Sequence, residues 1–289
     1  MFESLGFRGS VNVQAPGVRY RLLTPHTGAE VSGVDLSQDL PQEEVDDIQR
    51  LLVNYGAVFF RDQRLTREQH RVIGRRFGAL HIHPAAPAPE GYPEILIIHA
   101  DDKHKGVAGS GWHSDVSCDP EPPAASMLYM KHMPAVGGDT LFSNMYAAYE
   151  ALSDDLKTYL EGLTAVHSGA DVYRGGGYKS SDQGARLPVS EHPVIRTHPV
   201  TLRKALFVNY GFTRQIVGVP RRESEAMLRF LFEHVNDPLF ICRFRWAPNS
   251  IAFWDNRCVQ HYPTDDYFPA TRTAERVTIC GDRPFYEEA

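Results

Sequence analysis

Residues 239–254, LFICRFRWAPNSIAFW, contain two runs of apolar, aromatic and β-branched residues on either side of a Pro-Asn turn sequence. Runs of this kind favour β-strands, and Pro and Asn favour the turn between them. Similar strand-like runs occupy residues 20–23, 57–60, 94–100, 126–132, 139–143, 204–209 and 272–280. The sequence therefore predicts a mainly β protein whose many strands are connected by turns.

Helical spacing occurs at only a few places between these runs. In residues 41–55, Val45, Ile48 and Leu52 recur at three- and four-residue spacing, and acidic residues occupy the first turn, as in an amphipathic helix. Further helices are expected at 66–77, 146–152, 154–162 and 222–236. Because strands and helices do not alternate regularly, a doubly wound parallel sheet is a poor fit. We expect a mainly β (α+β) fold, a double-sheet jelly roll with flanking helices.

The composition is that of one ordinary globular domain. Of 289 residues, 42% are hydrophobic and 23% are charged, which is enough apolar material for one substantial core. No linker or charge run divides the chain, so we expect a single domain over residues 1–289. The net charge of −6 and the scattered basic residues argue against a nucleic-acid partner. No apolar run approaches the roughly 20 residues that span a membrane, so no membrane partner is expected.

The cysteines and the first residues favour a cytoplasmic location. Residues 1–10, MFESLGFRGS, lack the basic start and the apolar run of a signal peptide. No C-x-x-C pair occurs, and the spacing is not that of a disulfide framework. We therefore interpret the four cysteines as free thiols in a reducing compartment, namely Cys118, Cys242, Cys258 and Cys280.

One long segment, residues 169–192 (GADVYRGGGYKSSDQGARLPVSEH), lacks hydrophobic periodicity. It contains a Gly triplet and many polar residues, and loops of this length in compact domains are commonly lids or disordered segments. We expect a loop here and interpret it as a lid over the active site, with a disordered segment as the alternative.

The pentapeptide Gly111-Trp112-His113-Ser114-Asp115 indicates a metal site. In an extended backbone residues i and i+2 point to the same face, so His113 and Asp115 can reach one metal ion together. A second histidine from a distant strand would complete a two-His, one-carboxylate face, which suits non-haem Fe(II). H-x-D alone is weak evidence in a chain with 13 histidines, and a surface hydrogen-bonded pair is the alternative.

The C-terminal segment strengthens this interpretation. Gln260 and His261 follow an apolar strand in what we expect to be a polar turn, and His261 is the candidate third ligand. In a strand over 272–280, Arg272 and Arg276 share one face. Guanidiniums directed into a barrel require anionic partners, for which the distal carboxylate of 2-oxoglutarate and an acidic substrate are the candidates. The alternative is that this face is exposed to solvent.

At this point the sequence resembles the taurine dioxygenase family, which also contains 2,4-dichlorophenoxyacetate dioxygenases and alkylsulfatases. The matching stretches occur in family order over nearly the whole chain: FGALHIHP (77–84), WHSDVS (112–117), PPAASML (122–128), GGDTLFSNMYAAYEAL (137–152), ALFVNYGFT (205–213), RFRWAPNSIAFWDNRCVQHYPTDDY (243–267) and RVTICGDRPF (276–285). The resemblance implies a double-stranded β-helix (jelly-roll) fold and a dioxygenase that uses Fe(II), 2-oxoglutarate and O₂. It places His113, Asp115 and His261 at the iron ligands.

The resemblance also implies roles for other residues. Thr140 and Arg272 match the residues that hold the distal carboxylate of 2-oxoglutarate. The residues that match substrate contacts are Arg276, His83, the backbone N–H of Val116, and Phe212 in an apolar pocket. The alternatives without a binding role are a loop histidine for His83, a strand threonine bonded to the backbone for Thr140, and an ordinary core residue for Phe212. His81 is expected to be structural, and Trp112 and Trp254 are expected to pack around the site.

The sequence departs from the taurine enzyme where that enzyme binds its substrate's amine. Residues 85–87 are Ala-Ala-Pro and residues 107–111 are Val-Ala-Gly-Ser-Gly, without the tyrosine and polar groups of the taurine enzyme. We therefore expect a small anionic substrate, a sulfonate, sulfate ester or carboxylate with a less polar tail. Tyr173 and Tyr178 are expected to shape the tail pocket, and the resemblance favours a homo-oligomer, a dimer or tetramer.

Three alternatives remain open from the sequence. The same chemistry could act on an aryloxyalkanoate or an alkyl sulfate. A zinc-dependent hydrolase could use the same three ligands to hold Zn²⁺ and a water, but it would leave the two arginines without a common purpose. A catalytically inactive jelly-roll binding protein would have no need of a complete set of ligands.

Overall fold

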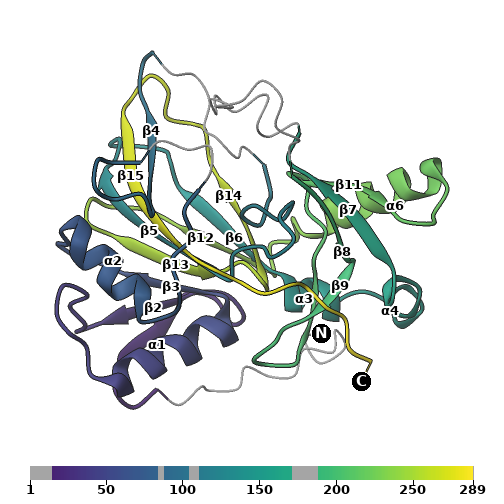
Figure 1. The fold of residues 1–289 in the computed structure, drawn as a ribbon, viewed down its shortest axis with the longest axis horizontal. Helices are drawn as coiled ribbons and strands as arrows, with labels where there is room; N and C mark the ends of the chain where they lie inside the picture. Colours follow the sequence, from purple (N-terminus) through teal and green to yellow (C-terminus); the bar gives the residue numbers. More distant parts are fainter. Residues whose placement is uncertain (1–14, 84–87, 104–110, 171–187, 289) are drawn as a thin grey trace.

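The computed structural model describes residues 15–83, 88–103, 111–170 and 188–288 (Figure 1). The prediction of a mainly β protein with few helices is confirmed. The expected lid lies mostly outside the described residues. Its last part is not a loop, because Val189–Pro193 forms strand β8, which pairs with β7 (Thr164–Ser168). None of the described helices is long and apolar enough to cross a membrane, and all four cysteines are free.

The largest sheet has seven strands, and all but one of its neighbouring pairs are antiparallel. Only β2 and β3 run parallel. The strand order is β1 (Arg19–Leu22), β2 (Ala29–Ser32), β3 (Ala57–Phe60), β13 (Ile251–Asp255), β5 (Ala125–His132), β15 (Arg272–Ile279) and β4 (Ile95–Ala100). A second, antiparallel sheet contains β12 (Ile241–Phe244), β6 (Thr140–Asn144) and β14 (Val259–Pro263).

Side chains from the two sheets meet in one buried cluster. Phe59 of the large sheet stacks on Phe244 of the small one, with ring centroids 4.1 Å apart, and its ring lies edge-on to Phe142 at 5.4 Å. Phe142 in turn contacts Trp254 at 5.7 Å. These aromatic contacts fix the spacing of the sheets, so the strands that carry the candidate site residues are held by a continuous core.

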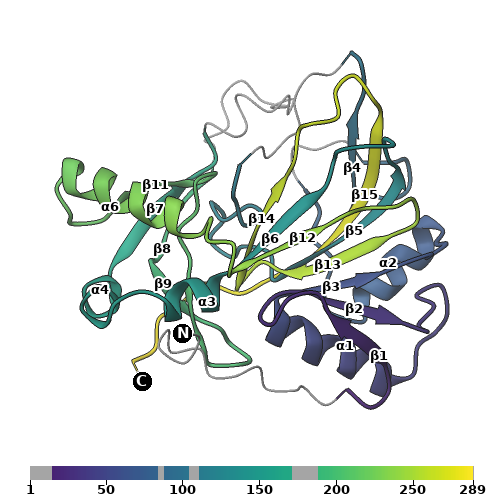
Figure 2. The same ribbon diagram turned by 180° about the vertical axis from the view of Figure 1, so that it is seen from behind.

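Two helices cover the other face of the large sheet (Figure 2). Helix α1 (Gln42–Tyr55) buries Ile48 and Leu51 and ends at Gly56, whose left-handed φ of 73° lets its N–H bond to the carbonyl of Leu52. Helix α2 (Arg67–Arg75) begins at Thr66, which forms a capping box with Gln69.

A further group of short elements lies together at the right of Figure 1. It comprises β7, β8, β11 (Thr213–Ile216), the pair β9 (Ile195–Thr197) and β10 (Lys204–Leu206), and helices α3 (Met145–Glu150), α4 (Asp154–Leu160) and α6 (Arg221–His234). The helices were expected. Strands β7, β8, β9 and β11 were not, because they are short and carry polar residues, and only pairing with neighbours makes them strands.

One prediction about the C-terminal segment is wrong. Gln260 and His261 lie in strand β14 and are buried, whereas a polar turn was expected. The strand is held by pairing with β6, where His261 lies opposite Phe142. The Gln260 side chain is bonded in the interior, where its amide NH₂ donates to the carbonyl of Val208 at 2.8 Å.

Candidate metal centre and anion sites

The structure brings His113, Asp115 and His261 together. One potential ligand atom from each lies within 4.8 Å of those of the other two. The two histidine backbones form an isolated antiparallel bridge, in which the N–H of His113 donates to the carbonyl of His261 at 3.1 Å and the reverse bond is 2.9 Å. Two residues far apart in sequence are therefore fixed side by side by backbone bonds, with ring centroids 4.1 Å apart.

Both imidazoles are suited to bind a metal ion. Nδ1 of His113 lies 2.9 Å from the carbonyl of Gly111, which can only accept, so this nitrogen carries the proton and Nε2 keeps its lone pair. The His261 ring packs against Trp254 at 4.7 Å, and its buried Nδ1 has no hydrogen-bond partner among the described residues. Burial lowers the pKa of both histidines, so both rings are neutral near pH 7.

Asp115 is held as a carboxylate from two sides. Its Oδ1 accepts a hydrogen bond from Nη1 of Arg276 at 2.5 Å, and its Oδ2 accepts one from the hydroxyl of Ser126 at 2.6 Å. Burial opposes ionisation, but Arg276 and the two nearby histidines outweigh it and hold the pKa of Asp115 well below its usual range. Two neutral imidazoles and one carboxylate are the donor set of mononuclear non-haem Fe(II), so these residues fit that ion.

A second group of possible ligands does not fit a metal ion. His198, Asp255 and Cys258 also lie close together and are buried. However, Asp255 already accepts bonds from Arg257 and from Nε2 of His198 at 3.1 Å. Nδ1 of His198 accepts two backbone N–H groups at 3.2 Å, and burial raises the pKa of the Cys258 thiol. This network fixes the turn after β13, and no sequence motif indicated it.

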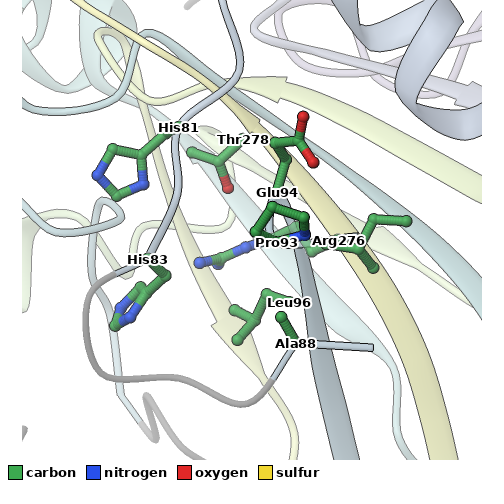
Figure 3. Close-up of a pocket in the computed structure, with 9 residues that line it drawn as sticks. His81, His83, Ala88, Pro93, Glu94, Leu96, Arg276 and Thr278 are labelled. Carbon is green, nitrogen blue, oxygen red and sulfur yellow. The ribbon is translucent and has the colours of Figure 1, made fainter. Parts of the chain in front are cut away.

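Arg276 faces a small pocket as well as Asp115. The pocket is lined by His81, His83, Leu96 and Thr278, among others. Figure 3 shows the guanidinium of Arg276 directed toward the two imidazoles, whereas the carboxylate of Glu94 points away from it.

Apart from Glu94, the side chains that line this pocket carry a positive charge or none. Glu94 is bonded elsewhere, to Arg71 and Arg75. Burial and the charge of Arg276 lower the pKa of His83 to about 4, so near pH 7 His83 offers a neutral imidazole that can donate one N–H. The pocket therefore has the electrostatics of an anion site.

His81 was expected to be structural, and the structure also places its ring in the pocket. Its backbone N–H donates to the carbonyl of Thr278 at 2.8 Å, which attaches this segment to β15. Its ring lines the same pocket as that of His83, with the ring centroids 6.3 Å apart. The H-x-H spacing places both rings in the pocket. The position of the His81 ring could have been predicted from this spacing.

Arg272 and Thr140 lie near each other at a second site. Arg272 is only 3% exposed, and its Nε donates to the carbonyl of Gly138 at 3.3 Å. Among the residues that the structure describes, no carboxylate forms an ion pair with it. The hydroxyl of Thr140 accepts a hydrogen bond from the indole of Trp246 at 3.0 Å, and this indole lies 5.9 Å from the Arg272 guanidinium. A buried cation without an anionic partner is costly, which indicates an anionic ligand.

Val116 and Phe212 form a small buried cluster with Cys118 next to the candidate metal ligands. Val116 has a φ of 47°, an uncommon conformation for a β-branched residue. No role was predicted for Gly211, which precedes Phe212. A Cβ atom at this position would lie 2.9 Å from Cβ of His113, so only glycine fits without a shift.

Trp112 and Trp254 were expected to pack around the site, and they do. Tyr173 and Tyr178, which were expected to shape a tail pocket, lie outside the described residues. Trp112 contacts Tyr262 at 5.7 Å and donates its indole N–H to Asn236. Trp254 packs on His261 and donates to Asn256 at 2.9 Å.

Comparison with known proteins gives a consistent result. Residues 19–278 match the family model described as taurine catabolism dioxygenase TauD, TfdA family. A putative alpha-ketoglutarate-dependent sulfonate dioxygenase of Schizosaccharomyces pombe is 40% identical over 90% of this chain and 68% of its own length. An alkylsulfatase of Acinetobacter baylyi is 34% identical over 92% and 86%. The crystal structure of a taurine dioxygenase from Burkholderia xenovorans superposes with a TM-score of 0.82 at 38% identity, covering 94% of this chain and 92% of that one.

Proposed function

The chain belongs to the TauD, TfdA family of dioxygenases, and from this premise we propose that His113, Asp115 and His261 hold its iron. The protein is a dioxygenase that depends on Fe(II), 2-oxoglutarate and O₂. When bound, the iron supplies the oxidative decarboxylation of 2-oxoglutarate to succinate and CO₂ and the hydroxylation of a C–H bond. The donor set, the fixed tautomer of His113 and the ionised Asp115 support this assignment.

We further propose that the two main sheets form a double-stranded β-helix within a single domain over residues 1–289. Two observations support this. The strands of the large sheet share one core with β12, β6 and β14. A second buried cluster includes residues from Ala15 to Ile279, so the two ends of the described chain contribute to the same core.

We propose that Thr140 and Arg272 bind the distal carboxylate of 2-oxoglutarate. The cosubstrate is a diacid, so the end that does not reach the iron needs a cation and a hydroxyl at a distance from the ligands. Arg272 supplies a buried guanidinium without an ion-pair partner among the described residues, and Thr140 supplies a hydroxyl beside the same indole. A planar guanidinium can bind a carboxylate through two parallel hydrogen bonds.

We propose that Arg276, His83 and the backbone N–H of Val116 bind the anionic head of the substrate, with Phe212 as an apolar wall beside it. The observation that carries this proposal is the position of Arg276, whose buried guanidinium touches the metal ligand Asp115 and also faces the pocket. An anion bound there lies beside the metal centre, so the carbon next to the anionic group is held where oxidation occurs.

The substrate class that fits best is a small organic sulfonate or sulfate ester, with a carboxylate such as an aryloxyalkanoate as the alternative. The pocket offers one permanent cation and N–H donors, which suit an oxyanion with several acceptor atoms. The relatives named as a sulfonate dioxygenase and an alkylsulfatase act on anions of this kind. Leu96 provides an apolar contact for the carbon chain.

The test is a panel of alkanesulfonates, alkyl sulfates and aryloxyacetates of matched length, with succinate release as the readout. We expect turnover with at least one anion and none with the neutral amide or alcohol of the same carbon skeleton. Asp115→Ala should abolish succinate release, whereas exposed Arg221→Gln should leave it unchanged. Equal turnover of the charged and neutral compounds would contradict the anion site, and an active Asp115→Ala enzyme would contradict the metal assignment.

A further inference from the structure

Trp246 lies beside both residues of the proposed 2-oxoglutarate site, and nothing in the sequence indicated a role for it. It follows β12 and is 6% exposed. Its indole N–H donates to Oγ1 of Thr140 at 3.0 Å, and the guanidinium carbon of Arg272 lies 5.9 Å from the centre of its ring. One side chain therefore contacts the hydroxyl and the cation that we assign to the same carboxylate.

The direction of this hydrogen bond determines what the Thr140 hydroxyl can do. An indole nitrogen can only donate, so Oγ1 of Thr140 must be the acceptor. The hydroxyl proton of Thr140 is then directed away from Trp246. Within the described ranges, no acceptor for that proton is found. The hydroxyl is thus prepared to donate to an added acceptor, and a carboxylate paired with Arg272 would be one.

The indole has little freedom to turn. Phe244 lies edge-on to it, with ring centroids 4.9 Å apart. Phe244 is itself held between Phe59, stacked at 4.1 Å, and the guanidinium of Arg61, also 4.1 Å from its ring. Because Phe59 belongs to the core between the sheets, the orientation of the Trp246 N–H is set by the core and does not depend on a ligand.

We propose that Trp246 is a positioning residue for the distal carboxylate of 2-oxoglutarate: its N–H orients the Thr140 hydroxyl, and its ring holds the guanidinium of Arg272 beside it. This inference rests on the proposed function, in which Thr140 and Arg272 bind that carboxylate. It implies that Trp246 contributes to selection of a dicarboxylic keto acid over a shorter monocarboxylic one and contributes nothing to binding at the metal end.

The test compares Trp246→Phe with the wild-type protein in binding measurements that require no turnover. Both proteins are loaded with Mn(II), which is redox-stable, and titrated by calorimetry with 2-oxoglutarate and with 2-oxobutyrate, which lacks the distal carboxylate. Trp246→Phe keeps a ring and removes the N–H. We expect 2-oxoglutarate to bind roughly threefold to tenfold more weakly, the scale of one hydrogen bond. The affinities for 2-oxobutyrate and for Mn(II) should be unchanged.

A double-mutant cycle separates an action through Thr140 from a general packing effect. In Thr140→Val, which has no hydroxyl to orient, adding Trp246→Phe should weaken 2-oxoglutarate binding little further. In Thr140→Ser, which keeps the hydroxyl, the full effect of Trp246→Phe should return. If Trp246→Phe does not fold, Trp246→Tyr, which also lacks a donor at the indole nitrogen position, takes its place.

Two outcomes would overturn the inference: equal weakening of both keto acids, or effects of the Trp246 and Thr140 substitutions that simply multiply. A wild-type protein that binds 2-oxoglutarate no better than 2-oxobutyrate would instead contradict the proposed carboxylate site itself. The failure of the inference and the failure of the proposed function are therefore distinguishable.

Discussion

Arg276 donates a hydrogen bond to Asp115 at 2.5 Å, so the residue proposed to anchor the substrate touches a residue proposed to bind the metal. Both side chains are buried. They are brought together by β15 and β5, because Thr278 of β15 lies opposite Ser126 of β5, and the Ser126 hydroxyl bonds to the other oxygen of Asp115. The proposed metal centre and the proposed anion pocket thus share one charged group, the guanidinium of Arg276.

The first prediction concerns this group. In Arg276→Gln the substrate loses its only permanent cation among the described pocket residues, and removal of one member of a buried charge pair costs about 2 kcal/mol or more. At a metal concentration that saturates both proteins, we expect KM for the anionic substrate to rise about 30-fold or more, while KM for 2-oxoglutarate stays close to the wild-type value. Steady-state kinetics with each substrate varied in turn measure both. Arg221→Gln, an exposed arginine, is the matched control, and an equal rise in both KM values would contradict the assignment.

The second prediction concerns the support of Asp115. Asn256 donates to the hydroxyl of Ser126 at 3.1 Å, and this hydroxyl donates to Oδ2 of Asp115. Ser126→Ala removes the bond that orients the carboxylate, and disturbing such support commonly costs tenfold to a hundredfold in metal affinity. We expect Mn(II) to bind at least about tenfold more weakly, measured by calorimetry or by paramagnetic relaxation of water.

Ser143→Ala is the control for this substitution. Ser143 is also a buried serine in a strand, but its hydroxyl donates to the carbonyl of Val235. Its replacement should leave the affinity for Mn(II) unchanged. An unaltered affinity in Ser126→Ala would show that the Asp115 carboxylate is positioned by other contacts.

Some of this arrangement was predictable from the sequence because it depends on local spacing. His113 and Asp115 were identified from an i, i+2 pattern, and Arg272 and Arg276 from the alternation of a strand. The alternation is seen in the structure, where Ala274 packs between the sheets and Val277 packs toward the helices.

Other parts were not predictable because they depend on partners distant in sequence. His261 was expected in a turn because Gln260 and His261 are polar, yet they form a strand that pairs with β6. The bond between His198 and Asp255 joins residues 57 positions apart without a motif. No sequence pattern indicated the proposed role of Trp246, because that role depends on the hydroxyl of Thr140, more than 100 residues away in the sequence.

The third prediction concerns stability and pH. His70 of α2 is fully buried; its Nε2 bonds to the carbonyl of Met127 at 3.2 Å, and burial lowers its pKa to about 3. In the unfolded chain a histidine binds its proton near pH 6.5. Between these two values the unfolded state holds more protons, so the free energy of unfolding falls as the pH falls from about 6.5 toward 3.

His70→Gln keeps a donor for the Met127 carbonyl and does not titrate. We therefore expect the difference in unfolding free energy between wild type and variant to shrink as the pH is lowered, by roughly 1.4 kcal/mol per pH unit below 6. Urea unfolding at pH 7.5, 6 and 5 measures this. A difference that is constant over the range would mean that His70 does not remain neutral in the folded protein.

The fourth prediction concerns Gly211, the close neighbour of His113. The N–H of Gly211 donates to the carbonyl of Trp112 at 3.1 Å, which fixes this segment against residues 111–115, proposed to bind the metal. In Gly211→Ala the added Cβ would lie 2.9 Å from Cβ of His113, so His113 or the loop must shift. Because the neighbouring atom is the first carbon of the ligand side chain, we expect the shift to reach the imidazole and to weaken Mn(II) binding roughly tenfold.

Gly17→Ala provides the control, because its added Cβ would be equally crowded, 2.9 Å from Oδ2 of Asp47, a residue of α1 outside the site. Crowding in a packed region costs about 1 to 3 kcal/mol wherever it occurs, so both variants should lose stability. Only Gly211→Ala should also lose metal affinity and turnover. Were the two variants to lose metal affinity alike, the effect would follow from stability alone, and the close approach of Gly211 to His113 would have no bearing on the site.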